Sequence, residues 1–494
     1  MADPPTFRAS TGSPETVKTD LLVLPVFEGP ALGPGVAQTE RALGVRFLEV
    51  LRRHQVSGKR GDSLMLPGPS RSVLLLGVGP KAEATSGSIR EAAMRAGAAA
   101  RPFASVASTL TLDADSAGQA AQAFAEGFLL GSYRFDGAKS SPEPIRTRTV
   151  TAFVTGDART ATRKGLERGR ITGSATNWAR DLTNTSASMT TPETLAEAAR
   201  SMAKDRGLTC KVWTRAALER GGFGGILAVG RGSANEPRMV ELTYRGGGRS
   251  KPIALTGKGI TFDSGGLNIK QQPEMSWMRA DMAGAAAALA AVRAVAELGT
   301  KENVIAAIPF AENIPGPSSY RPGDVVRHRG GKTSEVLDTD SEGRVLLADA
   351  LAYLCEQAPS VILDSATLTD AAGLGLDLFA VMGDDAASVR GVIEAGVAAG
   401  DRGWEIPLWS RYRHLIDSEV ADVKNTGSHD VDNSMMAGLF LQTFVDPAVP
   451  WVHLDIGSSA WAEYPADLWP EGATGSPTRA FIRFIEQRAG SAPD

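Results

Sequence analysis

The chain has 494 residues, of which 43% are hydrophobic and 22% are charged, and its formal net charge is −4 at pH 7. This length allows two domains, because single hydrophobic cores stop growing at roughly 250–300 residues, and the slightly negative charge gives no support to generic nucleic-acid binding. The only two cysteines, Cys210 and Cys355, exclude a disulfide framework.

The first third of the chain alternates short β-rich runs with alanine-rich helical runs. Strands are predicted at 20–28, 72–79, 109–113 and 149–156, and helices at 89–102 and 117–135. The start of the chain shows no basic segment followed by an apolar one, so we expect no secretory signal. This part carries no clustered polar motif, and its alternation is typical of an α/β layer with a largely parallel sheet.

A long helix is predicted over about 163–185, and a second helix follows with Thr191 as its N-cap and Pro192 at its first position. A second α/β series then has predicted strands at 210–214, 225–230, 238–245, 252–262, 303–310, 360–368, 378–383 and 450–456. The predicted fold class is therefore α/β with two domains. A smaller N-terminal domain spans 1–165, and a larger one spans 166–494, with a mixed, mostly parallel central sheet flanked by helices.

The longest apolar stretch, 283–299, is rich in alanine and is interrupted by Arg293. It lacks the roughly 20 strongly apolar residues of a membrane span, so we expect no contact with a membrane. Together with the scarcity of cysteine, this predicts a cytoplasmic protein.

Polar residues gather at the ends of the later apolar strands, where open α/β sheets place their sites. Three stretches carry them: GKGITFDSGGLNIK (257–270) with Lys258, Asp263 and Lys270, MRADMAGAAAAL (278–289) with Asp281, and EVLDTDSEGRVLLADAL (335–351) with Asp338, Asp340, Glu342 and Arg344. Each stretch alone has an ordinary structural explanation, since Asp281 could cap a helix, worth about 1 kcal/mol. The lysines could simply be exposed.

Four of these carboxylates, brought to one edge of a sheet, would repel each other unless cations lay among them. Oxygen ligands in this number suit hard or borderline divalent ions such as Mg²⁺, Mn²⁺ or Zn²⁺. Bridging carboxylates are also how two-metal hydrolytic sites are built. The sequence therefore favours a site for one or more divalent cations.

The same three stretches resemble motifs of the leucyl (cytosol) aminopeptidase family. The third resembles that family's N-T-D-A-E-G-R-L signature, the first its Gly-Lys-Gly-x-x-Phe-Asp-[Ser/Thr]-Gly-Gly segment, and the second its metal-binding helix entry. The shorter segments ARDLTNT, SATLT, ADVKN, HLDI and GATG also lie in the order expected for the family. The resemblance covers about residues 170–480, whereas the N-terminal third resembles the family only in length and α/β character.

The resemblance implies a metal-dependent aminopeptidase that releases N-terminal amino acids from peptides, with 166–494 as its catalytic domain. It implies two divalent ions per subunit, Mn²⁺, Zn²⁺ or Mg²⁺. The tighter ion would be bound by Lys258, Asp263, Asp281 and Glu342, and the more exchangeable one by Asp263, Asp340 and Glu342. Asp263 and Glu342 would then bridge the two ions.

The remaining roles are also carried over from the family. Lys270 and Arg344 match its two catalytic residues, and a bicarbonate ion would be bound near Arg344. Met278, Thr367 and Asp370 would line the pocket for the first side chain of the substrate. The family commonly has glycine where this chain has Asp370, so an altered preference for the N-terminal residue is one expectation and ordinary specificity is the other.

Two alternatives remain at this point. The chain could be a DNA-binding or regulatory protein with secondary peptidase activity, although it shows no basic stripe. It could instead be an inactive structural relative, although all seven of the positions assigned to metals and catalysis are intact. The resemblance further implies a homohexamer acting on peptides with a free N-terminus.

Overall fold

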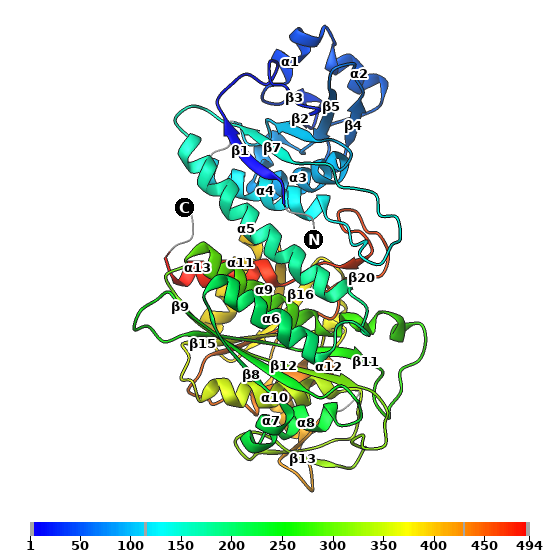
Figure 1. The fold of residues 1–494 in the computed structure, drawn as a ribbon, viewed down its shortest axis with the longest axis vertical. Coiled ribbons are helices and arrows are strands. Elements are labelled where there is room, and N and C mark those ends of the chain that lie inside the picture. The colour runs from blue at the N-terminus through cyan, green and yellow to red at the C-terminus, as the bar shows by residue number, and fades with distance from the viewer. Residues whose placement is uncertain (1–3, 113–115, 428–429, 491–494) are drawn as a thin grey trace. The chain divides into compact units, whose positions relative to one another are not determined.

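The computed structural model describes residues 4–112, 116–427 and 430–490. The chain divides into two compact units, one running to Asn177 and one starting at Trp178, with Asp467–Trp469 belonging to the first (Figure 1). The helix predicted over about 163–185 is α5 (Arg159–Asn184). The proposed domain boundary at residue 165 therefore falls within a helix.

The N-terminal unit is built on a seven-stranded sheet of order β1-β7-β6-β2-β5-β4, with β3 paired to β2. Its strands are β1 (Thr6–Ser10), β2 (Leu21–Phe27), β3 (Ala31–Leu32), β4 (Ser63–Leu66), β5 (Ser72–Gly77), β6 (Ser105–Ser108) and β7 (Thr149–Phe153). Its helices before α5 are α1 (Val36–Leu43), α2 (Phe47–Arg53), the 3₁₀ turn η1 (Lys81–Glu83), α3 (Ser86–Ala100) and α4 (Ala117–Ser132). Successive side chains of β2 enter two cores on opposite faces, because side chains alternate along a strand.

The prediction of a strand at 109–113 is wrong in position. The strand is β6, which ends at Ser108, and Thr109 to Leu112 form a turn. The Leu112 N–H donates to the Thr109 carbonyl oxygen at 3.0 Å, and the Thr109 hydroxyl donates to the Pro34 carbonyl oxygen at 2.6 Å. These local bonds take the place of a strand ladder, although the alternation of Thr and Leu is typical of a strand. Residue 113 lies outside the described residues.

The second unit, which starts at Trp178, contains a nine-stranded sheet of order β17-β16-β19-β15-β10-β12-β9-β8, with β11 paired to β12. Its strands are β8 (Thr209–Trp213), β9 (Arg238–Arg245), β10 (Ile253–Gly257), β11 (Ile260–Asp263), β12 (Asn303–Asn313), β15 (Val361–Ala366), β16 (Leu378–Gly383), β17 (Arg402–Glu405) and β19 (Trp451–Asp455). Strands β12, β10, β15 and β19 run parallel, while β9 is antiparallel to β12 and β16 is antiparallel to β19. The predicted mixed sheet is confirmed.

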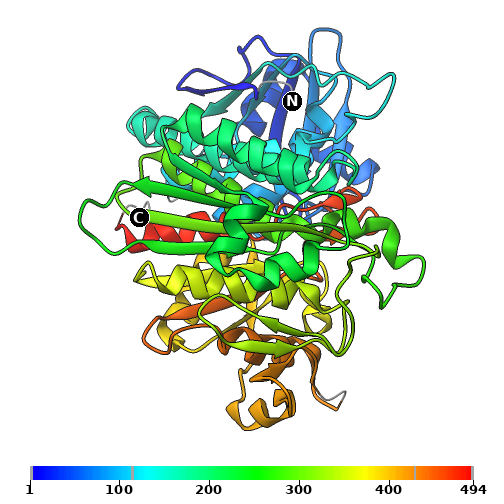
Figure 2. The same cartoon turned by 60° about the horizontal axis from the view of Figure 1, so that its bottom comes forward.

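Helices cover both faces of this sheet (Figure 2). Those of the unit are α6 (Pro192–Arg206), α7 (Arg215–Gly221), α8 (Gly224–Gly230), α9 (Ala283–Leu298), α10 (Glu342–Cys355), α11 (Ala386–Ala399), α12 (Asn433–Gln442) and α13 (Thr478–Arg488). Shorter elements are η2 (Glu274–Met282), η3 (Ala371–Gly373), η4 (Ser410–Ile416), the small sheet β13 (Val325–Arg327), β14 (Thr333–Glu335) and β18 (Val423–Lys424), and the pair β20 (Trp461–Ala462) and β21 (Gly472–Ala473).

Residues 225–230, predicted as a strand, belong to helix α8 instead. The N–H of Ile226 donates to Oδ2 of Asp349 at 2.9 Å, so a carboxylate of α10 satisfies a backbone donor in the first turn of α8. Ile226 and Val229 are buried in the same core as α10. A short apolar run bounded by glycines fits both a strand and a buried helix, and here the packing against α10 decides for the helix.

The start of α9 packs directly on the strand ends because two glycines face them. A Cβ atom on Gly257, the last residue of β10, would lie 2.3 Å from the carbonyl oxygen of Gly284. A Cβ atom on Gly284 would lie 2.1 Å from the carbonyl oxygen of Ser365. Only glycine allows this approach, which brings the residues just before α9 to the carboxyl ends of β10 and β15.

Candidate functional site

The three polar stretches meet at the carboxyl ends of β10 and β15. Lys258 directly follows β10, and Asp263 is the last residue of β11. Asp281 lies at the end of η2, just before α9, and Glu342 is the first residue of α10. Side chains from four separate elements therefore converge at one edge of the sheet, which is where open α/β sheets bind their ligands.

Lys258 is the buried centre of this cluster, with 4% of its surface exposed. Its Nζ lies 2.8 Å from Oδ1 of Asp281 and 2.8 Å from Oε1 of Glu342, and it donates to the carbonyl oxygen of Thr367 at 2.9 Å. Burial acts to lower the pKa of Lys258, but the carboxylates of Asp281, Glu342 and Asp263 outweigh it and raise that pKa. In this arrangement Lys258 carries a proton, and it would have to lose the proton to bind a metal ion.

Lys270 pairs with a different side of the cluster. Its Nζ lies 3.0 Å from Oδ2 of Asp263 and 2.6 Å from Oδ1 of Asp340. Burial again opposes the charge, but Asp263 and Glu342 raise the pKa of Lys270. The two lysines therefore neutralise different carboxylates of one group, and Lys270 remains an ammonium.

The carboxylates of Asp263, Asp340 and Glu342 are close enough to share a metal ion, since one oxygen of each lies within 4.8 Å of the others. Burial, followed by the charge of Asp263, raises the pKa of Asp340 to about 7, and burial is also the main cause of the raised pKa of Glu342. Oδ2 of Asp281 and Oε2 of Glu342 are buried without a hydrogen-bond partner in the described residues. Buried polar atoms normally have partners, so these orphaned oxygens fit divalent cations between them.

Side chains that no sequence motif identified hold this cluster in place. Asn313 ends β12, and its Nδ2 donates to Oδ1 of Asp263 at 2.7 Å and to the carbonyl oxygen of Thr339 at 2.9 Å. The buried Tyr320 hydroxyl donates to the same carbonyl oxygen at 3.0 Å. Asn313 lies at the end of β12, just after the apolar run 304–311, and a polar side chain at the end of a buried strand is the signal that could have identified it.

Arg344 is a buried guanidinium, 1% exposed, and among the described residues it forms no ion pair with a carboxylate. Its Nη1 donates to the carbonyl oxygen of Asn425 at 3.0 Å and its Nη2 to Oδ1 of Asn433 at 3.1 Å, while Nε has no partner. Burial lowers the pKa of Arg344 to about 10. A buried cation with an unpartnered N–H donor and no direct ion pair among the described residues fits an anion.

A cavity of about 420 Å³ opens over the cluster. Of the residues predicted for the site, it is lined by Lys258, Asp263, Lys270, Met278, Asp281, Asp340, Arg344, Thr367 and Asp370. Glu342 does not line it and lies fully buried beneath Lys258. The structure thus brings the ten predicted residues to one place, together with Trp277 and Trp461, which the sequence analysis did not single out.

Hydrogen bonds to Asp455, the last residue of β19, hold the loop that carries Thr367 and Asp370. Oδ1 of Asp455 accepts the N–H of Leu368 and of Thr369, each at 3.3 Å, and its Oδ2 accepts the Thr369 hydroxyl at 2.5 Å. The Thr367 hydroxyl donates to Oδ1 of Asp281 at 2.8 Å. Asp370 itself is exposed at the mouth of the cavity.

Helices of the described residues are either too short or too polar to cross a membrane.

Comparison with family models matches residues 177–482 to the catalytic domain of the cytosol aminopeptidase family and residues 23–142 to the N-terminal domain of that family.

Individual relatives are similar over nearly the whole chain. A protein of Syntrophotalea carbinolica named "Probable cytosol aminopeptidase" is 39% identical, covering 96% of this chain and 98% of that protein. A protein of the same name from Streptomyces coelicolor is 38% identical, covering 97% and 98%.

Solved structures of two other proteins share the fold. The bottromycin maturation enzyme BotP has a TM-score of 0.85 at 36% identity, covering 95% of this chain and 99% of BotP, and a similar structure holds it in complex with Mn. A mutant leucine aminopeptidase of tomato has a TM-score of 0.90 at 28% identity, covering 99% and 98%.

Proposed function

The chain belongs to the cytosol aminopeptidase family, and we propose that the acidic cluster at the ends of β10 and β15 is its two-metal site. As a member of this family the chain is a metal-dependent aminopeptidase, a hydrolase that acts on the peptide bonds of peptide substrates. The observation that carries the proposal is the convergence of Asp263, Asp340 and Glu342, with one oxygen of each within 4.8 Å.

In this proposal Lys258, Asp263, Asp281 and Glu342 hold the tighter ion, and Asp263, Asp340 and Glu342 hold the more exchangeable one. Two divalent ions in such a site supply an activated water and polarise the carbonyl group of the scissile bond. Lys258 can be a ligand only as a neutral amine, so its proton is released when metal binds. We assign Mn²⁺ as the first choice because BotP has been solved with Mn, with Zn²⁺ and Mg²⁺ as the other ions of suitable chemistry.

Lys270 has a separate role in the proposal. Its ammonium sits on the cavity wall with 12% of its side chain exposed, beside the carboxylates of Asp263 and Asp340. These carboxylates favour the protonated form. A fixed positive charge at that position stabilises the oxyanion that develops on the scissile carbonyl.

We propose that Arg344 holds a bicarbonate ion. Its guanidinium is buried, lines the cavity and has an Nε atom without a hydrogen-bond partner. Planar anions suit the fork of an arginine. Arg344 would hold such an ion at the cavity wall, where the ion would supply general acid–base chemistry.

Met278, Thr367 and Asp370 form the proposed pocket for the first side chain of the substrate. Met278 offers an apolar surface, whereas Asp370 is an exposed carboxylate at the mouth. A carboxylate there narrows the pocket and attracts a basic side chain, so we propose that the preference for the N-terminal residue departs from leucine.

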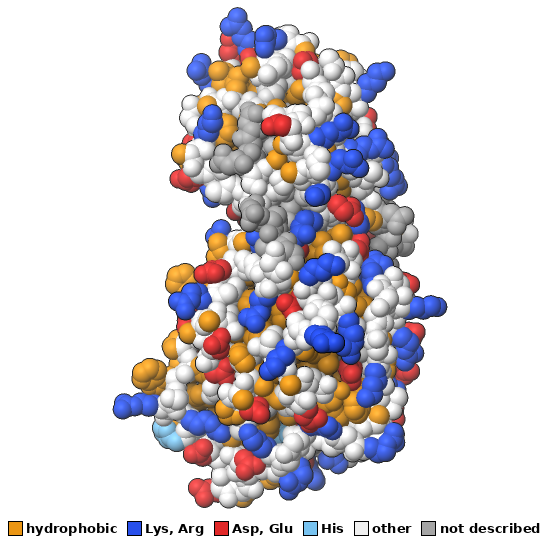
Figure 3. Space-filling view, turned by 90° about the vertical axis from the view of Figure 1, so that its left-hand side faces the viewer, with side chains coloured by type: hydrophobic (Ala, Val, Ile, Leu, Met, Phe, Trp, Pro, Cys, Tyr) orange, Lys and Arg blue, Asp and Glu red, His pale blue; other side chains and the backbone are white. Residues whose placement is uncertain are grey.

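A homohexamer in the cytoplasm is part of the proposal and rests on the family alone. The DNA-binding alternative gains no support from the relatives, which are named as aminopeptidases. On the face in Figure 3, basic and acidic side chains are interspersed, without the basic stripe that nucleic-acid binding requires.

The proposal can be tested by dialysing the protein against a chelator and adding back Mn²⁺, Zn²⁺ or Mg²⁺ separately. Hydrolysis of aminoacyl amides should disappear on dialysis and return with at least one ion, and metal analysis should find two ions per chain. A panel of leucyl, arginyl, glycyl and methionyl amides then measures the preference. Full activity after complete removal of metal would contradict the two-metal site.

A further inference from the structure

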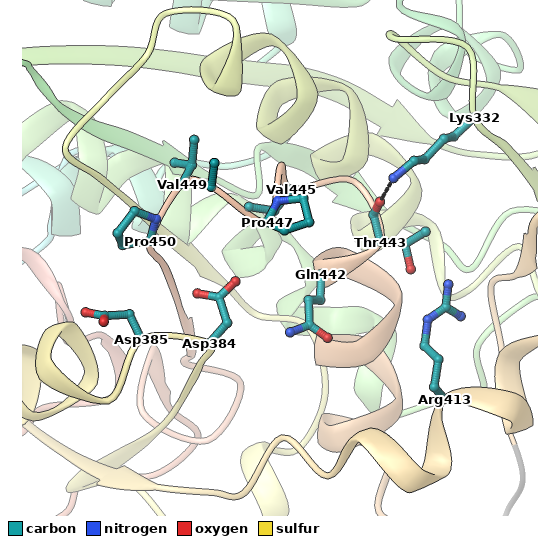
Figure 4. Close-up of a pocket in the computed structure, with 11 residues that line it drawn as sticks. Lys332, Asp384, Asp385, Arg413, Gln442, Thr443, Val445, Pro447, Val449 and Pro450 are labelled. Carbon is teal, nitrogen blue, oxygen red and sulfur yellow. Dashed lines mark hydrogen bonds between the residues drawn. The ribbon is translucent and has the colours of Figure 1, made fainter.

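A second cavity, of about 530 Å³, lies in the catalytic unit between α11, η4 and the segment that joins α12 to β19 (Figure 4). It shares no lining residue with the cavity over the acidic cluster. Its size falls within the roughly 300–1,000 Å³ that is usual for small-molecule sites. Nothing in the proposed reaction uses it.

The two sides of this cavity carry opposite charges. Asp384 and Asp385 lie on one side, whereas Lys332 and Arg413 lie on the other, with Gln442 between them (Figure 4). Backbone hydrogen bonds hold both carboxylates in place. Asp384 accepts the N–H of Trp451 at 3.0 Å, and Asp385 accepts the N–H of Ser388 at 2.8 Å. The negative side is thus held in place by the backbone of β19 and α11.

These opposite charges do not neutralise each other. Within the described part of the chain, neither Asp384 nor Asp385 forms an ion pair, and the nearest carboxylate to Arg413 is Asp417, at 3.9 Å. Nη1 of Arg413 is buried and has no hydrogen-bond partner in the described residues. Lys332 donates to the carbonyl oxygen of Thr443, which fixes its ammonium at the same side.

An apolar surface completes the cavity. Val445, Pro447, Val449 and Pro450 form a strip beside the two charged sides (Figure 4). A simple anion would meet the repulsion of the carboxylates, and a metal ion would meet that of Lys332 and Arg413. A ligand that complements all three features has an ammonium group, a carboxylate group and an apolar part.

We propose that this cavity is a binding site for a small zwitterion with an apolar side chain, namely a free amino acid or a dipeptide. The ammonium group pairs with Asp384 and Asp385, the carboxylate pairs with Arg413 and Lys332, and the side chain packs on the strip of valines and prolines. Both kinds of molecule are within reach of an aminopeptidase, because a free amino acid is a product of its reaction and a dipeptide is a substrate.

The test must separate this cavity from the catalytic one, which also binds amino acids. Full-length, metal-loaded enzyme is first saturated with an amino-acid hydroxamate, and loss of hydrolysis verifies that the metal site is filled. Calorimetric titration with L-leucine should then still show saturable binding. 4-Methylpentanoate, which lacks the amine, and 3-methylbutylamine, which lacks the carboxylate, should each bind about tenfold more weakly or worse, because each loses a charge-assisted contact.

Variants locate the binding. Arg413→Gln and Asp384→Asn should each weaken the binding of leucine to the blocked enzyme by about tenfold or more. Arg411→Gln removes an exposed arginine of η4 that does not line the cavity and should leave binding unchanged. Thermal unfolding of each variant verifies that it is folded.

Leucyl-leucine titrated in the same way decides between the two sources, since tighter binding than that of leucine identifies the dipeptide and weaker binding identifies the amino acid. Absence of saturable leucine and leucyl-leucine binding to the blocked enzyme would overturn the proposal. So would binding that Arg413→Gln and Asp384→Asn leave unchanged.

Discussion

Nζ of Lys258 lies 2.8 Å from Oε1 of Glu342, and the two side chains are only 5% and 0% exposed. A buried charge pair of this kind is costly to break from one side, because the remaining charge stays buried without a partner. The pair links the turn after β10 to the first residue of α10. It therefore connects the proposed metal site to the packing of the sheet.

Lys258→Ala and Lys270→Ala should have different effects. Loss of Lys258 removes a proposed ligand and leaves the buried Glu342 and Asp281 without their cation, so this variant should bind less metal. Lys270→Ala should keep its metal and lose about 10²–10³-fold in kcat, the usual effect of removing one oxyanion-stabilising group. Metal analysis of the dialysed proteins and steady-state kinetics measure the two effects. Equal loss of metal in both variants would contradict this division of roles.

Arg344→Ala should abolish any stimulation by bicarbonate. The wild-type rate in degassed buffer should rise as bicarbonate is added, if the buried guanidinium holds the anion as proposed. In Arg344→Ala the rate should be lower by about 10²-fold or more, as expected when an acid–base group is lost, and it should not respond to bicarbonate. Arg344→Lys, which keeps a charge, is the matched control. A variant that lost its metal would instead indicate a structural role for Arg344.

Asp370→Gly should shift the preference for the N-terminal residue toward leucine. The carboxylate of Asp370 stands at the mouth of the cavity over the acidic cluster, and its removal widens the pocket and reduces its negative charge. The ratio of kcat/KM for arginyl over leucyl amide should therefore fall in the variant. Asp377→Asn, at an exposed aspartate outside the cavity, is the control for charge alone. An identical, leucine-dominated profile in wild type and variant would contradict the proposal.

The pair of His453 and Asp364 should make stability depend on pH. Nδ1 of His453 lies 2.5 Å from Oδ1 of Asp364, and both side chains are fully buried. Burial opposes the charged imidazole, but Asp364 outweighs it and raises the pKa of His453. A raised pKa means that the stabilisation is fully present below the ordinary histidine value of 6.5 and is lost as the pH rises through the pKa of the folded protein.

Denaturant unfolding of wild type and His453→Gln from pH 5 to pH 9 tests this expectation. The difference in the free energy of unfolding should be about 3–5 kcal/mol at the acidic end, as for other broken buried pairs, and should shrink toward the alkaline end. A difference that grows with pH would contradict the assigned direction.

Much of the catalytic unit could be predicted because local signals and packing agree there. Thr191 accepts the N–H of Thr194 and caps α6 as predicted, and the alanine-rich run became α9, which ends at Leu298 before Gly299. The prediction of a strand at 225–230 was wrong because the length and composition of this run fit both a strand and a buried helix. Only its packing against α10 distinguishes the two. Local sequence carries no record of that contact.

The candidate site was predictable from its charged residues but not from its supporting ones. Lysines and aspartates at strand ends stand out in a sequence, and the structure places them together. Asn313 and Tyr320 act by bonding loops that are distant in the sequence. Such roles depend on which strands become neighbours, and the order of a sheet cannot be read from periodicity.

The two glycines where α9 meets the strand ends imply that uncharged mutations can produce metal deficiency. A methyl group on Gly257 or Gly284 must displace backbone atoms that it would approach to 2.3 Å or less. A shift of the start of α9 would carry with it Asp281, which lies just before this helix, so affinity for the ion would fall without the loss of any proposed ligand. In a screen of random variants, alanine at either glycine would lower activity as the loss of a metal ligand does. Excess metal would restore the activity of these glycine variants, whereas it would not restore that of Asp281→Ala.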